Sequence, residues 1–138
     1  MSVLLLDLGN SRWKLARARA GETGPVTTGA YSDLGGLQAA AQRDADPLDA
    51  ILLASVVGEA VTASVIDVLH RAFSLPVRQV LSTDAMPDFE AGYREPGQLG
   101  VDRVLAMVAA RARTRRPLCV VDAGTAVTVD FVDGGGLH

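Results

Sequence analysis

The sequence predicts an α/β fold in which a mixed sheet is flanked by helices. Three short apolar runs, Val3–Leu6, Ile51–Val57 and Leu118–Asp122, are too short for helices and are typical of buried strands. Two segments between them, Val61–Phe73 and Val101–Ala112, repeat their apolar residues at the spacing of an amphipathic helix. Strands that alternate with helices along the chain indicate the α/β class.

The first strand is expected to be half of a hairpin. A turn at Leu8–Ser11 follows the apolar run, and from Arg12 onward polar and apolar residues alternate, which is typical of a strand that returns beside the first. The next segment, residues 20–29 (AGETGPVTTG), is rich in Gly, Pro and Thr and is predicted to be a loop.

The remaining elements follow from the same signals. A helix is predicted over Leu34–Arg43, although two glycines weaken its start. PVRQVL (residues 76–81) supplies a strand, and the Pro- and Gly-containing residues 86–100 form a connection. VTVDFV (residues 127–132) alternates in polarity and is expected to form a strand behind LCVVD.

Composition excludes several classes of protein. The chain has 138 residues, of which 49% are hydrophobic and 21% charged, so it is globular and long enough for a real core. A net charge of −3 argues against nucleic acid or anionic membranes as partners. The single cysteine, Cys119, excludes an intramolecular disulfide and is expected to be a small buried side chain. Without a basic leader or a long apolar run, the chain is expected to be cytoplasmic.

An internal repeat divides the chain. VLLLDLGNSRWKLA and LCVVDAGTAVTVDF share an apolar run, an aspartate, a glycine, a small polar residue and an alternating strand. This similarity predicts a duplicated domain, with residues 1–116 as the first copy and 117–138 as the opening strands of a second similar domain whose remainder is absent. The chain would then contain one full half and the first hairpin of the other half.

The repeated motif suggests phosphate binding. Asp7 and Asp122 each end a strand just before a glycine, where backbone N–H groups can form a concave set of donors for phosphate oxygens, and Ser11 and Thr125 can add hydroxyls. A carboxylate beside a phosphate requires a cation, either Mg²⁺ or a monovalent ion, and Lys14 can add positive charge. The alternative is an ordinary turn in which the aspartate accepts local hydrogen bonds. Two matching copies favour the phosphate site.

A third motif, GYREPGQLGVDR (residues 92–103), leads into a predicted helix. Asp102 lies in the first turn, where the helix N-terminus stabilises a carboxylate, and such a carboxylate can accept a proton from an attacking hydroxyl. The alternative is helix capping by Asp102, with Arg103 as a solvated neighbour, and the residues alone leave both open. The basic run at the end of this helix is interpreted as solvated cations: Arg111, Arg113, Arg115 and Arg116.

In this order and at these separations, DLGNSRWK, GYREPGQLGVDR and DAGTAVTVD resemble the type III pantothenate kinases, the Bvg accessory factor family of the acetate and sugar kinase, Hsc70 and actin superfamily. The resemblance implies a ribonuclease-H-like, actin-like domain. It also implies ATP-dependent phosphorylation of pantothenate to 4'-phosphopantothenate, the first step of coenzyme A synthesis, by a homodimer.

The resemblance further implies a role for each motif. The positions that match the ATP site are Asp7, Leu8, Gly9, Asn10, Ser11, Lys14, Gly124 and Thr125. Asp7 matches the contact to Mg²⁺ through phosphate, and Asp122 matches the position that binds K⁺ or NH₄⁺. The positions that match the pantothenate site are Tyr93, Gly100, Val101, Asp102 and Arg103, with Asp102 in the place of the catalytic base.

Two other functions remain open on the sequence. One is a nucleotide-binding module without catalysis that acts in regulation, as the accessory-factor name suggests. The other is a different kinase or phosphatase of the same superfamily. The substrate motif counts against the first, because a regulator would not need Tyr93, Asp102 and Arg103 together.

Overall fold

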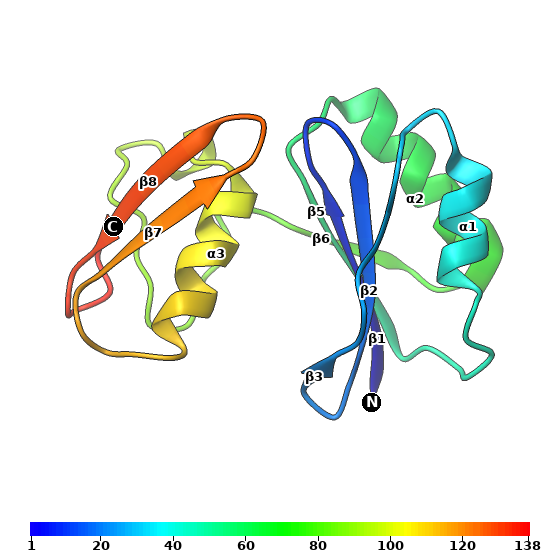
Figure 1. The fold of residues 1–138 in the computed structure, drawn as a ribbon, viewed down its shortest axis with the longest axis horizontal. Helices are drawn as coiled ribbons and strands as arrows, with labels where there is room; N and C mark the ends of the chain where they lie inside the picture. Colours follow the sequence, from blue (N-terminus) through cyan, green and yellow to red (C-terminus); the bar gives the residue numbers. More distant parts are fainter. The chain divides into compact units, whose positions relative to one another are not determined.

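A computed structural model describes residues 1–138. The chain forms two compact units, which we call the first unit (Met1–Val80) and the second unit (Leu81–His138). Figure 1 shows both, with the first unit carrying the larger sheet.

The first unit contains the predicted mixed sheet. Strands β1 (Ser2–Leu8) and β2 (Trp13–Arg19) form the antiparallel hairpin. Strand β5 (Ala50–Ser55) pairs with β1 in parallel, and β6 (Val77–Val80) pairs with β5 in parallel. These four strands confirm the predictions made from the apolar runs and the alternating segment.

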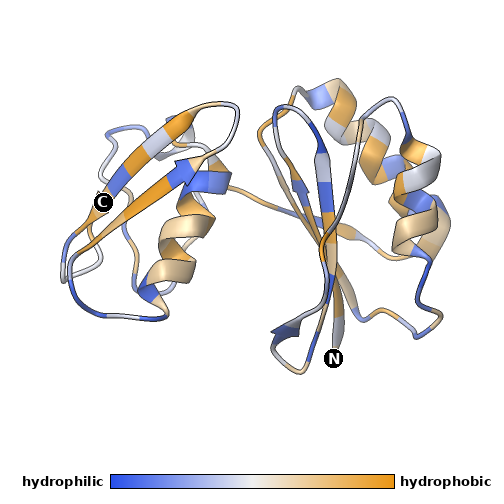
Figure 2. Cartoon of the chain, in the orientation of Figure 1, coloured by the Kyte–Doolittle hydropathy of each residue, from blue (hydrophilic) through white to orange (hydrophobic).

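Two helices, α1 (Leu34–Ala41) and α2 (Glu59–Phe73), cover one side of this sheet (Figure 1). The Asp33 side chain caps α1 by accepting from the N–H of Gly36 at 2.7 Å, which offsets the weakness of the glycines at its start. The apolar faces of both helices pack on the sheet, as the hydropathy colouring of Figure 2 shows. The buried core comprises Leu4, Leu6, Leu8, Trp13, Leu15, Leu37, Ala41, Ile51, Leu53, Val65 and Leu69.

The loop predicted over residues 20–29 is partly wrong, because it contains strands β3 (Glu22–Thr23) and β4 (Thr27–Gly29). Both pair with β2, whose edge is left open by the hairpin, so a segment of loop composition gains backbone hydrogen bonds. Gly29 lies against the buried Trp13 ring, where an added Cβ would be only 2.2 Å from a ring carbon. The Trp13 indole N–H donates to the carbonyl of Ala30 at 2.9 Å.

The second unit contains a 3-10 turn (Pro96–Gln98), helix α3 (Val101–Arg111) and the hairpin of β7 (Leu118–Ala123) and β8 (Val127–Val132). The predicted helix and both strands are therefore confirmed. Its own core packs α3 on the inner face of the hairpin through Leu99, Val104, Met107 and Val132. The division into domains at residue 116 stays a prediction, and the boundary of the two compact units along the chain lies between residues 80 and 81.

The other face of the β7–β8 hairpin is apolar and exposed. We call it the apolar outer face; Val121 is 62% exposed, Val127 68% and Phe131 69%. The prediction that Cys119 is buried is wrong, because Cys119 lies opposite Phe131 on this face and is exposed. The apolar outer face comprises Cys119, Val121, Ala123, Val127, Val129 and Phe131.

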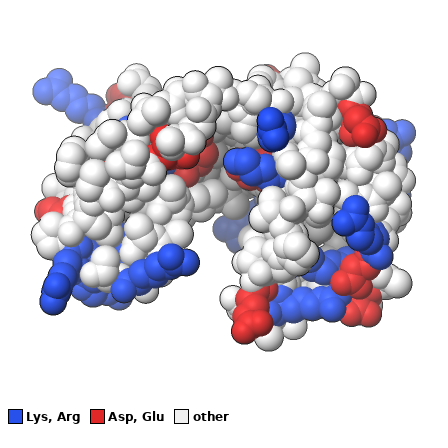
Figure 3. Space-filling view, viewed as in Figure 1, with Lys and Arg blue, Asp and Glu red and all other residues white.

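The basic run after α3 is solvated only in part. Arg111 is 3% exposed and donates through Nη2 to the carbonyl of Gly134 at 3.2 Å, so its predicted solvation is wrong. The C-terminus of α3 lies beside this turn, whose carbonyl oxygens need a donor. Arg115 is exposed and pairs with Asp88 at 2.7 Å, and blue side chains gather at this end of the unit (Figure 3). None of the helices has the length and apolarity that crossing a bilayer requires.

Candidate functional site

The first phosphate motif forms the β1–β2 turn. Asp7 is the second-to-last residue of β1 and pairs in register with Lys14 of β2. The Lys14 ammonium donates to Asp7 Oδ2 at 2.9 Å, and the two side chains are 51% and 38% exposed. The N–H of Gly9 donates to the carbonyl of Arg12 at 3.2 Å and closes the turn. Lys14 thus places its positive charge beside the carboxylate of the motif.

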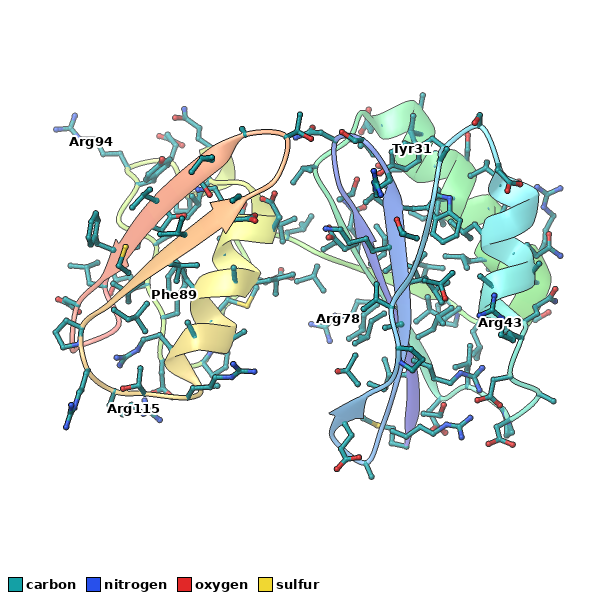
Figure 4. The ribbon with its side chains drawn as sticks, in the orientation of Figure 1. Tyr31, Arg43, Arg78, Phe89, Arg94 and Arg115 are labelled. Carbon is teal, nitrogen blue, oxygen red and sulfur yellow. The ribbon has the colours of Figure 1, made fainter.

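Tyr31 holds this turn from the side (labelled in Figure 4). Its hydroxyl donates to the carbonyl of Gly9 at 2.5 Å and lies 3.2 Å from that of Arg12. Burial, with a smaller effect from the nearby Asp7 carboxylate, raises the pKa of Tyr31 to about 12. The residue therefore stays a neutral donor, and it fixes the backbone on which the motif depends.

The second phosphate motif also forms a hairpin, at the β7–β8 turn, which is one residue shorter than the β1–β2 turn. Asp122 is again the second-to-last residue of its strand, and Gly124 is again the first residue of the turn. The N–H of Gly124 donates to the carbonyl of Ala126 at 2.9 Å, and Thr125 is exposed within the turn. Both sequence copies therefore form antiparallel hairpins with an aspartate at the same strand position, but the turns differ in length, and Asp122 faces Thr128 where Asp7 faces a lysine.

The acidic residues of these motifs do not form a metal cage. No group of three or more His, Cys, Asp or Glu side chains is arranged to hold a metal ion. Mg²⁺ in phosphoryl-transfer sites is commonly held by one or two carboxylates together with substrate phosphates and water. A single accessible carboxylate such as Asp7 fits that kind of site, whereas it does not fit a resident structural metal.

The third motif, residues 92–103, begins where residues 136–138 pair with residues 88–92. The N–H of Glu90 donates to the carbonyl of Gly136, and the N–H of His138 to that of Glu90, both at 2.9 Å. Gly92 permits this pairing, because an added Cβ would lie 1.8 Å from the carbonyl oxygen of His138. As a result the rings of Tyr93 and His138 lie with centroids 5.5 Å apart.

The motif ends in the first turn of α3. Gly100 is the N-cap, with extended backbone, and the side chain of Val101 is buried in the core. Asp102 is partly exposed, and its Oδ1 accepts from the N–H of Arg103 at 2.8 Å. The carboxylate thus lies at the positive end of the helix dipole, accessible to a reacting group.

Arg103 is paired with a carboxylate that the sequence did not single out. Its Nε donates to Asp130 Oδ2 at 3.0 Å and its Nη2 to Asp130 Oδ1 at 2.5 Å. His138 Nε2 lies 3.0 Å from the same Oδ1. Hydrogen bonding from Arg103 holds the pKa of Asp130 below its usual range, and hydrogen bonding to Asp130, with a smaller effect from Tyr93, raises the pKa of Arg103.

The second unit therefore brings Tyr93 and Arg103 into one cluster through Asp130 and His138. Sequence reasoning missed Asp130, His138 and, in the first unit, Tyr31. The available signal for Asp130 was an acidic residue inside an otherwise apolar alternating strand. No comparable local signal marks His138 or Tyr31, because each acts through contacts distant in sequence.

A solved structure described as a structural study of the Aquifex aeolicus PPX-GPPA enzyme resembles this chain. The TM-score is 0.50 and the sequence identity 15%, over 98% of this chain and 49% of that one. At this identity the likeness concerns the fold alone. It confirms the predicted ribonuclease-H-like, actin-like fold.

Sequence comparisons identify the family. The type III pantothenate kinase from Halorhodospira halophila is 39% identical over 145 residues, which cover 98% of this chain and 56% of that protein. The one from Stenotrophomonas maltophilia strain R551-3 is 36% identical, over 100% of this chain and 56% of that protein. The chain thus spans about half the length of the curated relatives it matches. The family model described as type III pantothenate kinase matches residues 3–138, and the chain belongs to that family.

Proposed function

We propose that the protein containing this chain transfers the γ-phosphoryl group of ATP to the terminal hydroxyl of pantothenate and so forms 4'-phosphopantothenate for coenzyme A synthesis. The observation that carries the proposal is the family match over residues 3–138, which includes all three motifs. The two hairpins, each with an aspartate and a glycine before the turn ends, and the single cluster around Arg103 support it.

ATP and Mg²⁺ are assigned to the two hairpin turns. Backbone N–H groups of a tight turn bind phosphate oxygens, and Asp7 with Lys14 supplies one carboxylate and one cation at the first turn. When bound, Mg²⁺ neutralises charge on the phosphates. Asp122 is the proposed ligand for K⁺ or NH₄⁺. The proposed nucleotide contacts are Asp7, Leu8, Gly9, Asn10, Ser11, Lys14, Gly124 and Thr125.

The acceptor is assigned to the substrate motif. The pantothenate hydroxyl oxygen attacks the γ-phosphorus, the bond to the bridging oxygen breaks, and ADP leaves with that electron pair. Asp102 accepts the hydroxyl proton, for which its exposure and its place at the helix N-terminus suit it. Arg103 binds the pantothenate carboxylate by paired hydrogen bonds. The proposed contacts are Tyr93, Gly100, Val101, Asp102 and Arg103.

The test is phosphoryl transfer by the wild-type protein and by Asp102→Asn, with and without K⁺. A base contributes about 10² to 10⁴ in rate, so we expect kcat to fall by at least about 100-fold while pantothenate still binds. Asp67→Asn, which changes an exposed residue of α2, is the matched control. Full activity of Asp102→Asn would remove Asp102 from the role of base.

The same assay separates the other candidate functions. Nucleotide binding without turnover in the wild-type protein would favour a regulatory module. Release of free phosphate without a phosphorylated product would favour a phosphatase. Since relatives are longer than this chain, we expect residues 1–138 alone to transfer little.

We also propose that residues 117–138 open a second domain similar to residues 1–116. The common fold of the two hairpins and the greater length of the relatives support this, and so does the apolar outer face, which further strands or helices of that domain would cover. A thiol reagent should modify Cys119 rapidly in residues 1–138 and slowly in a protein that includes the remainder. Equal rates would contradict the proposal. A homodimer is a further proposal, and light scattering tests it.

A further inference from the structure

Strand β8 places a carboxylate on its buried face. Asp130 is 3% exposed, whereas its neighbours Val129 and Phe131 are 50% and 69% exposed on the apolar outer face. Burying a charged group is costly unless it is paired and hydrogen-bonded, and a buried ion pair often adds little net stability over an apolar substitute. Stability alone therefore does not account for an aspartate at this position.

The main partner of Asp130, Arg103, belongs to the substrate motif, and its second partner, His138, lies beside Tyr93 of that motif. Arg103 binds both carboxylate oxygens of Asp130, through Nε at 3.0 Å and Nη2 at 2.5 Å, which is the two-point geometry that fixes the plane of a guanidinium. The Nε2 atom of His138 lies 3.0 Å from Asp130 Oδ1, and the His138 ring lies beside the Tyr93 ring in a tilted arrangement. The buried Asp130 carboxylate thus binds both Arg103 and His138, and His138 in turn contacts Tyr93.

The pairing leaves part of the guanidinium available. A guanidinium has five N–H groups, and the fork to Asp130 uses the one on Nε and one on Nη2. The Arg103 side chain is 26% exposed while Asp130 is buried, so the carboxylate binds the side of the guanidinium that faces the protein interior. Tyr93 is a further hydrogen-bond partner of Arg103, and the other outer N–H groups can bind a second carboxylate.

We propose that Asp130 is a positioning residue, which orients Arg103 so that its outer N–H groups bind the carboxylate of the acceptor substrate. The inference rests on the proposed function, because it takes pantothenate as that acceptor. Asp130 does not touch the acceptor, and it acts only through Arg103. Loss of Asp130 should therefore weaken recognition of the acceptor carboxylate and leave the transfer step itself intact.

The experiment compares the wild-type enzyme with Asp130→Asn, using pantothenate and an analogue whose carboxylate is replaced by a hydroxymethyl group. A hydrogen bond to a charged group contributes about 10- to 100-fold to binding, so we expect the KM for pantothenate to rise by about that factor with kcat within about twofold. The KM for the analogue should not change. Asp88→Asn, which removes an exposed partner of Arg115 in the same unit, is the control.

A double-mutant cycle tests whether Asp130 acts through Arg103. Arg103→Met should raise the KM for pantothenate at least as much, and adding Asp130→Asn to it should raise it no further. If Asp130→Asn does not fold, Asp130→Glu keeps the charge, shifts it by one methylene, and should show the same selective rise. An unchanged KM, or an equal loss for the analogue, would overturn the inference while the proposed function stands. A wild-type enzyme that does not phosphorylate pantothenate would overturn both.

Discussion

Gly92→Ala should destabilise the second unit far more than a glycine substitution five residues later. In the structure an added Cβ at residue 92 would lie 1.8 Å from the carbonyl oxygen of His138, a backbone atom that cannot move alone. At Gly97 the nearest atom to such a Cβ is a side-chain methyl of Thr83 at 3.8 Å, an ordinary contact. The two variants therefore differ in one respect, the close approach of the chain end to residue 92.

The expected magnitude follows from the bonds that the clash would break. Displacing residues 136–138 removes the two backbone hydrogen bonds of Glu90 and the contact of His138 to Asp130. At about 0.5 to 1.5 kcal/mol for each bond, and somewhat more for the charged one, Gly92→Ala should cost about 2 to 4 kcal/mol. Gly97→Ala should range from no change to about 1 kcal/mol of added stability, because alanine restricts the unfolded chain.

The assay is denaturant unfolding followed by the amide NMR signals of α3. The single tryptophan, Trp13, lies in the first unit and would report on a different transition. In Gly92→Ala the amides of Glu90 and His138 should also exchange faster with solvent. Equal midpoints for the two variants would refute the reasoning, since the pairing of residues 88–92 with the chain end would then not depend on glycine.

Three further outcomes are expected. Gly29→Ala should unfold the first unit more easily by about 1 to 3 kcal/mol and shift Trp13 fluorescence, because the new methyl overlaps the buried ring. Since its native pKa is lowered, Asp130 stabilises the second unit above pH about 4 and loses this effect as pH falls through the native pKa, so acid unfolding of Asp130→Asn should be less steep. The pKa of Tyr31 is raised to about 12, so its neutral hydroxyl stabilises the first unit below pH 10 and the stabilisation is lost toward pH 12. An ultraviolet titration of the wild-type protein should show a tyrosine ionising near pH 12, and this ionisation should be missing in Tyr31→Phe.

The regular elements were predictable because their signals are local. The helical spacing of apolar residues identified α1, α2 and α3 to within two residues at each end, and the apolar runs identified β1, β5 and β7. Strands β3 and β4 were missed because Gly and Thr give them the composition of a loop. The local signal for β3 was the two-residue turn Ala20–Gly21, whose positive φ angles are typical of a tight hairpin from β2.

The motifs of the candidate site were predictable, but the hydrogen bonds between residues distant in sequence were not. Asp7, Asp102 and Arg103 stand in recognisable contexts, but the carboxylate that orients Arg103 lies 27 residues further along. Alternation in β8 puts Val127, Val129 and Phe131 on one face and Asp130 with Val132 on the other, and it does not say which face a helix will cover. That choice follows from the packing of Val104 and Met107 of α3, which is a tertiary contact.

The packing of α3 on the β7–β8 hairpin fixes the distance between Asp102 and the second phosphate motif. The proposed base, Asp102, begins the helix, and the second phosphate motif lies at the turn of the hairpin, so both belong to one compact unit. The spacing between proton acceptor and that phosphate contact is then set by apolar side chains in a small core. A cavity made there, as by Met107→Ala, should disturb the register of acceptor and phosphate although no polar group has been altered.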